Sequence, residues 1–389
     1  KPWFIRYEYI SNPARSVFYL RFLAYILFLT AGIYQWIKFP SRKGNQIAGF
    51  FAILCCTIWL VYSYDYFFES LPRLIYANSP LNLLLVFGFY IGLNPHTWKW
   101  VHPILYLIAY GSIFAGWLYA LSLPSYHRHS GGSPMIYHVT IAVWPAAFLL
   151  LRCDRRALKE QILATLPLLG CLALAVFNQN RSWPLVCLSL LLLRYVVMNP
   201  AHTGQRWMRV GLFSLVILYL GGRVIFLMNT DISTGIKSLD GLVGRLDENT
   251  RGGQYVSFFE QIPIHQLITG GGANAGYDLD TIQNYQYIDN QHLFILFKFG
   301  LLAWFVYAYT VFAPALRLLL TRIGYPVRGM AYLLLLWGLS LGGLSVYQNI
   351  RPGPANMLMV MIAGRLIWET TRLRSLDRLS ESREHLSIN

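Results

Sequence analysis

The chain has 389 residues, of which 56% are hydrophobic and only 13% are charged. Because a soluble domain carries about 25% charged residues, this composition argues against an ordinary soluble enzyme and favours an integral membrane protein. The net charge of +15 would indicate nucleic-acid binding in a soluble protein, but the cytoplasmic loops of membrane proteins also collect Lys and Arg. We therefore expect no nucleic-acid partner.

Apolar runs recur along the whole sequence and predict roughly eleven or twelve membrane-spanning helices. The fold class expected is all-α, a polytopic integral membrane protein in which residues 1–389 form a single transmembrane domain. In chain order, the spans are expected at residues 17–37, 47–64, 74–93, 101–121, 135–151, 162–177, 183–198, 210–228, 292–311, 329–346 and 357–368.

Basic residues orient these spans, because Lys and Arg accumulate on the cytoplasmic side of a membrane. Clusters occur at alternate connections: Lys38/Arg42/Lys43, Arg152/Arg155/Arg156/Lys159, Arg206/Arg209, Arg317/Arg322/Arg328 and Arg372/Arg374/Arg378. The other connections then face outward, including one long loop at residues 229–291. With eleven spans the chain starts outside, which leaves either a further N-terminal helix or residues 1–10 along the membrane surface as open alternatives.

Three outward-facing arginines are candidates for binding an anion. Arg181 lies in the short turn "NQNRSW", Arg251 in "NTRGG" at the start of the long loop, and Arg351 in "QNIRPGPAN". Guanidinium binds phosphate through two parallel hydrogen bonds and keeps its charge when partly desolvated. A single arginine at this level is more often a headgroup-contacting residue, so the prediction depends on all three converging.

The end of the long loop, "YIDNQHLFILFKFG", carries the candidate catalytic groups. Asp289 and His292 are three residues apart and share one face of a helix, with the carboxylate at the helix N-terminus. Asn290 is the expected helix cap, although Asp289 could serve instead. Lys298 lies in the apolar run that follows and is not assigned to the site.

Two other features of the long loop are candidate substrate contacts. Gly271 and Gly272 belong to "TGGGANAGY", which lacks the spacing of a nucleotide-binding motif and predicts a tight connection with positive φ, or a close approach to a bulky ligand. Tyr285 and Tyr287 lie in the same loop and are expected either to contact the substrate or to belong to an interfacial aromatic belt.

No metal or cofactor is expected. The five cysteines lie in or beside apolar runs without metal-ligand spacing, at positions Cys55, Cys56, Cys153, Cys171 and Cys187. Asp278 and Asp280 are two residues apart, and we interpret them as part of the loop surface.

The order of these motifs resembles the O-antigen polymerase and O-antigen ligase superfamily of bacterial inner-membrane proteins, over residues 162–304. The resemblance implies a GT-C-like architecture with its active site facing the periplasm. Ligases carry a His-Asn pair nine residues before a glycine, whereas this chain has Asp289 and Asn290 before Gly300. This departure favours the polymerase branch.

The resemblance implies a metal-independent, inverting glycosyltransferase that joins undecaprenyl-pyrophosphate-linked repeat units into O-antigen or a related surface polysaccharide. Asp289 is the first candidate for the general base and His292 the second, while Arg181, Arg251 and Arg351 would hold the pyrophosphate. The expected partners are the lipid-linked glycan donor and acceptor, membrane lipid, and a candidate chain-length-regulating membrane protein. The alternatives are an O-antigen ligase that transfers glycan to lipid A-core and, in another class, a lipid-linked oligosaccharide flippase.

Overall fold

The protein is largely helical, with helix over 88% of its well-placed residues. The computed structural model describes residues 12–38, 43–64, 80–122, 135–153, 158–177, 182–198, 250–279, 282–288, 290–319, 327–341 and 354–387. Its elements are α1 (Asn12–Lys38), α2 (Lys43–Tyr62), η2 (Pro80–Phe87), α5 (Gly88–Leu93), α6 (Thr97–Ser122), α8 (Met135–Arg152), α9 (Leu158–Phe177), α10 (Ser182–Leu192), η3 (Leu193–Val197), α13 (Thr250–Gln261), α14 (Ile264–Thr269), β1 (Tyr277–Leu279), β2 (Ile282–Tyr285), α15 (Gln291–Leu319), α16 (Val327–Leu339) and α17 (Pro354–Ser387).

Three of the described helices are long and apolar enough to cross a membrane: Thr97–Leu121, Leu158–Phe177 and Gln291–Leu318. Large apolar side chains on the outer surfaces of the helices are widely exposed, for example Leu107 at 73% and Val61 at 71%. A soluble protein rarely exposes apolar surface on this scale, because contact with water is unfavourable. The coarse prediction of a helical membrane protein is therefore supported.

Most predicted spans coincide with helices, but two have a different local structure. The span expected at 74–93 contains a 3-10 segment, Pro80–Phe87, followed by the short α5, and both are buried among other helices. The span expected at 183–198 ends in a π-helical turn, Leu193–Val197, where the buried Arg194 donates to the carbonyl of Cys153 at 3.3 Å. The span expected at 210–228 lies outside the described residues.

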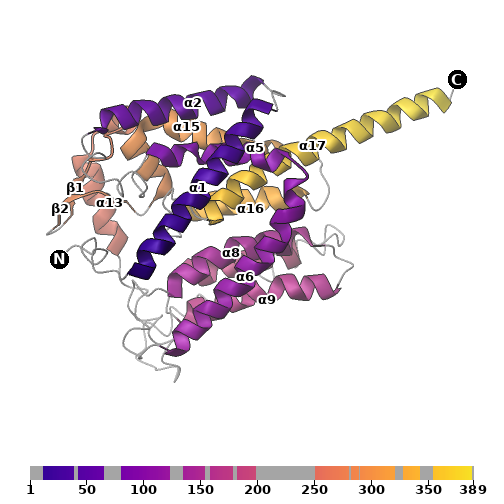
Figure 1. Cartoon of the computed structure of the whole chain (residues 1–389), viewed down its shortest axis with the longest axis horizontal. Helices are drawn as coiled ribbons and strands as arrows, with labels where there is room; N and C mark the ends of the chain where they lie inside the picture. The colour runs from indigo at the N-terminus through magenta and orange to yellow at the C-terminus, as the bar shows by residue number, and fades with distance from the viewer. Residues whose placement is uncertain are drawn as a thin grey trace.

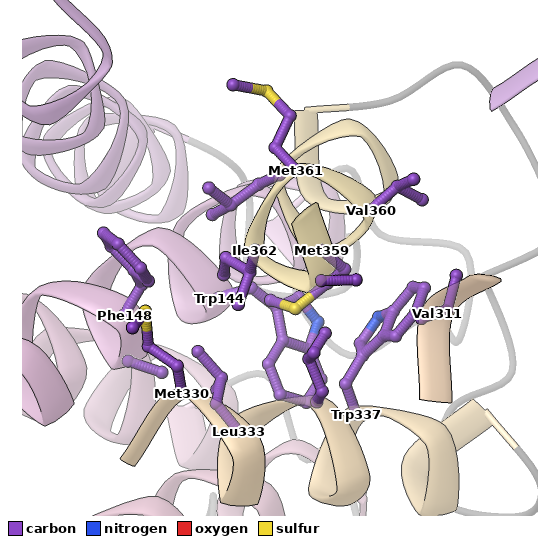
Figure 2. Packing of buried hydrophobic residues seen from close by; sticks show 14 of the residues in the cluster. Trp144, Phe148, Val311, Met330, Leu333, Trp337, Met359, Val360, Met361 and Ile362 are labelled. Carbon is purple, nitrogen blue, oxygen red and sulfur yellow. The ribbon is translucent and has the colours of Figure 1, made fainter. Parts of the chain in front are cut away.

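The main hydrophobic core forms where α8, α15, α16 and α17 meet. Figure 2 shows Trp144 from α8, Trp337 from α16 and Met359 from α17 packed together, while Met361 points to the other side of α17. On that other side α17 crosses α5 in close backbone contact. A Cβ on Gly92 would come within 1.9 Å of the Met361 carbonyl oxygen, and a Cβ on Gly364 equally close to that of Phe89. Only glycine fits at these two positions.

Helix α15 is broken at Gly300, whose φ of 79° and ψ of 177° are not helical. Residues 301–319 span about 28 Å at 1.5 Å per residue, nearly the thickness of a hydrocarbon core. The exposed large apolar side chains of α15 all lie after the break, at Leu301, Leu302, Phe305 and Leu316, and no residue from 291 to 299 is exposed. The predicted span of 292–311 lies within Gln291–Leu318, which is long and apolar enough to cross a membrane, and its exposed large apolar side chains follow the break.

The nine residues of α15 before the break pack with α13, α14 and the antiparallel β1–β2 hairpin, and we call this unit, residues 250–299, the cap. It has its own small core, separate from the main one, made by Phe258, Ile262, Tyr277, Ile288, Phe294 and Phe297. The rings of Phe258 and Tyr277 meet edge to face at 5.3 Å, as do those of Phe258 and Phe297 at 5.2 Å. In Figure 1 the cap lies at the left, and α17 leaves the bundle on the right.

Candidate functional site

The described residues include about half of the predicted site. Asp289, Arg181 and Arg351 lie outside them, and Arg251 is the second residue of α13 with its side chain outside them. Gly271, Gly272, Tyr285, Tyr287, Asn290 and His292 are all described, and all belong to the cap. The convergence of three arginines beside a carboxylate therefore stays a prediction.

Asn290 caps α15. Its Oδ1 accepts hydrogen bonds from the backbone N–H groups of His292 at 3.0 Å and Leu293 at 3.1 Å. Its own carbonyl accepts from the N–H of Phe294 at 2.8 Å. These bonds satisfy donors of the first helical turn that have no partner within the helix, and they fix where α15 begins.

His292 links the cap to the second part of α15 and to α16 through both ring nitrogens. Nδ1 accepts from the indole N–H of Trp304 at 3.2 Å, which fixes the tautomer with the proton on Nε2. Nε2 then donates to the carbonyl of Gly338 on α16 at 3.1 Å. In this arrangement neither nitrogen has a lone pair left to accept a proton from a substrate, so the geometry favours a positioning role for His292.

The glycine loop, residues 270–275, docks on the break in α15. The positive φ expected for this stretch occurs at Gly270, with 87°, and Gly272, with 82°. The N–H of Gly271 donates to the carbonyl of Phe297 at 2.8 Å, and the N–H of Gly272 donates to that of Lys298 at 2.9 Å. A break in a helix leaves the carbonyls of the preceding turn without partners, so the loop supplies the donors that the helix lacks.

A third carbonyl before the break, that of Phe299, accepts from the indole N–H of Trp59 on α2 at 3.0 Å. Ser63, at the end of α2, accepts from the N–H of Ala273 at 3.3 Å. Helix α2 therefore supports both the broken helix and the loop. The close approach that the glycines allow is thus an approach to protein backbone, since a Cβ on Gly270 would lie 2.8 Å from the Gly300 nitrogen.

Lys298, which we did not assign to the site, is part of this junction. Its side chain is fully buried, and its Nζ donates to the carbonyl oxygens of Ala273, at 3.0 Å, and Ala275. An ammonium group is buried only at high cost unless it is hydrogen-bonded, and these two carbonyls provide the bonds. Backbone acceptors have no sequence signature, so this role could not be predicted from the chain alone.

Tyr285 and Tyr287 lie on the aromatic side of the cap and are half-buried. Tyr287 stacks on Phe294 with ring centroids 6.3 Å apart, and Tyr285 meets Tyr277 edge to face at 5.7 Å. The hydroxyl of Tyr277 donates to the carbonyl of Tyr287 at 2.7 Å, which fixes the hairpin against the start of α15. The two predicted contact residues therefore belong to one aromatic cluster, four and two residues before Asp289 in the chain.

Gln291, which sequence reasoning also missed, is a buried polar residue of the cap. It is only 4% exposed, and neither its Oε1 nor its Nε2 has a hydrogen-bond partner. An amide in a first helical turn gives no sign in the sequence of whether it is buried or exposed. Gln291 therefore contributes an unused donor and an unused acceptor two residues after Asp289.

Within the described ranges, no group of three or more His, Cys, Asp or Glu residues could hold a metal ion. Asp278 uses its carboxylate inside the cap, where Oδ1 accepts from the N–H of Asn284 at 2.9 Å. The side-chain amide of Gln261 also holds the backbone of Asp278, with both bonds at 2.8 Å. Asp278 thus has a structural role in the hairpin.

No family model matches this chain, and no curated protein or solved structure matches it.

Proposed function

We propose that this protein is a bacterial inner-membrane glycosyltransferase that polymerises undecaprenyl-pyrophosphate-linked repeat units at the periplasmic face. The observation that carries the proposal is the cap, an aromatic unit hydrogen-bonded to the apolar helix α15, within the stretch of chain that contains the predicted base Asp289. A lipid-linked saccharide requires a binding site at the membrane surface, because its sugar must be bound there while its polyprenyl chain stays in lipid. Aromatic rings and amide groups are suited to bind sugars.

The apolar surface of the cap supports a lipid-linked substrate. Val256 and Phe259 on α13 are each 56% exposed, and Ile264 and Ile268 on α14 are 77% and 54% exposed. These residues form an exposed apolar face on α13 and α14. The opposite faces of the two helices pack against the cap core and α15. A polyprenyl chain leaving the bilayer could follow this surface to the site.

In the proposed reaction the hydroxyl of the acceptor sugar attacks the anomeric carbon of the donor. Asp289 removes the proton from this hydroxyl, and the C–O bond to the donor pyrophosphate breaks with inversion at the anomeric carbon. The leaving pyrophosphate takes the bonding electrons. Arg181, Arg251 and Arg351 neutralise it, with one such donor commonly contributing about 3 kcal/mol to the transition state. His292 holds α15 against α16.

The test is chain extension by the purified protein given lipid-linked repeat units. We expect a ladder of longer products from the wild type and none from Asp289→Asn at an equal protein level. A full ladder from Asp289→Asn would overturn the assignment of the base. Gene deletion tests the ligase alternative, since loss of a polymerase leaves one repeat unit on the lipid A-core, whereas loss of a ligase leaves the core bare.

One observation favours a second candidate, a transporter of lipid-linked oligosaccharide. Transporters often contain broken helices and buried charges, and α15 has both, at Gly300 and Lys298. The ammonium of Lys298 is already bonded to the loop carbonyls, which leaves the polymerase as the better-supported function. Liposomes distinguish the two, because a transporter would move labelled lipid-linked saccharide between leaflets without lengthening it.

A further inference from the structure

The unpaired amide of Gln291 requires an explanation, because a buried polar group without a partner lowers stability. Gln254, in α13, is also 4% exposed, and it has an interaction partner. The cap therefore provides a partner for the buried Gln254 but leaves the amide of Gln291 without one. A group kept unpaired at the edge of a candidate site is suited to bind a ligand.

The chemistry of the amide selects the kind of ligand. Nε2 donates and Oε1 accepts, so both are satisfied only by a partner that can also donate and accept. A pyrophosphate has acceptors alone and would leave Oε1 unpaired, whereas neighbouring sugar hydroxyls can pair with both atoms. The first turn of α15, where phosphate often binds to helices, is already occupied by Oδ1 of Asn290.

We propose that Gln291, two residues after the predicted base in the chain, binds hydroxyl groups of the acceptor saccharide. The proposal rests on the polymerase function proposed above and adds to it the position of the acceptor. The pyrophosphate of the donor then binds elsewhere, at the predicted arginines. Because Gln291 is covered in the free protein, the saccharide enters by displacing the groups that cover it.

The first experiment compares Gln291→Met with Gln254→Met, two substitutions of similar size at equally buried positions. Methionine replaces the amide by an apolar group, so Gln291→Met should unfold at the same temperature as the wild type or a higher one. Gln254→Met should unfold at a temperature several degrees lower, because it removes one member of an interacting pair. An equal loss in both variants would mean that Gln291 has a structural partner, and would overturn the proposal.

The second experiment measures chain extension by Gln291→Met with the single-repeat acceptor titrated at saturating elongated donor. We expect the KM for the acceptor to rise roughly tenfold, as for the loss of two neutral hydrogen bonds, with the KM for the donor unchanged. A variant with unaltered kinetics, or with the change in donor KM instead, would exclude an acceptor-binding role.

A binding measurement separates this inference from the proposed function. The probes are the free oligosaccharide released from the lipid-linked repeat unit by mild acid, and inorganic pyrophosphate. The oligosaccharide should raise the unfolding temperature of the wild type but not that of Gln291→Met, whereas any effect of pyrophosphate should be the same in both. An active wild type with equal oligosaccharide shifts in both proteins would sink the inference alone, while absence of chain extension by the wild type would sink the proposed function.

Discussion

The backbone N–H of Gly272 donates to the carbonyl oxygen of Lys298 at 2.9 Å. The Nζ of Lys298 in turn donates to the carbonyl oxygen of Ala273 in the same loop. The loop and the helix therefore satisfy each other's groups in both directions. This exchange is what allows a membrane helix to break at Gly300 without leaving buried carbonyls unpaired.

Replacing Lys298 by methionine should loosen the glycine loop. The change keeps the apolar stem but leaves the carbonyls of Ala273 and Ala275 without their donor, at a cost of about 1–3 kcal/mol. Hydrogen exchange over residues 270–279 should become faster, while Lys99→Met, at an exposed lysine of α6, should leave it unchanged. Equal exchange in both variants would show that the ammonium does not hold the loop.

Alanine at Gly300 should be poorly tolerated. The positive φ is unfavourable for alanine, and its Cβ would lie 2.7 Å from the carbonyl oxygens of Ile268 and Thr269. We expect a loss of about 1–3 kcal/mol, measured by unfolding in detergent. Gly253→Ala in α13 is the matched control: nothing lies within 4 Å of its Cβ, and helix propensity predicts a gain of about 0.5–1 kcal/mol.

Trp59→Phe should separate the hydrogen bond of this residue from its packing. Phenylalanine removes the indole donor to Phe299 but keeps an aromatic ring beside Tyr62. Trp337→Phe is the control, because the Nε1 of Trp337 is buried without a partner and no hydrogen bond is lost. We expect Trp59→Phe to be less stable than the control by about 1 kcal/mol, and equal unfolding midpoints would argue against the bond.

Glutamine at His292 distinguishes a positioning role from a catalytic one. A glutamine can donate to the carbonyl of Gly338 and accept from the indole of Trp304, but it cannot act as a general base at neutral pH. We expect His292→Gln to keep most chain-extension activity and His292→Ala to lose protein stability. An inactive, normally folded His292→Gln would instead make His292 the base.

Several features could be predicted from sequence because they depend on local patterns. Long apolar runs gave the helices, the three consecutive glycines indicated positive φ, and Asn290 stood where a helix cap is expected. The break at Gly300 could not be predicted, since "FKFGLLAW" is apolar apart from Lys298 and a single glycine in such a run does not reveal its φ.

The other unpredicted features depend on contacts between distant segments. The bonds of His292 reach Gly338 and Trp304, and those of Lys298 reach backbone carbonyls, for which no residue type is diagnostic. Whether Gln291 has a partner is likewise decided by what surrounds it in three dimensions. Local pattern thus indicates where a site lies along the chain, and tertiary packing decides which side chains remain available to a substrate.

The glycine crossing between α5 and α17 bears on how the protein is made. Most of the chain separates Gly92 from Met361, so Gly92 is synthesised long before the backbone of α17 that packs against it. Until α17 has been synthesised, Gly92 lacks the Met361 backbone that packs against it. The contact between α5 and α17 can therefore form only after α17 has been synthesised, and we expect its rate of formation to depend on when α17 becomes available.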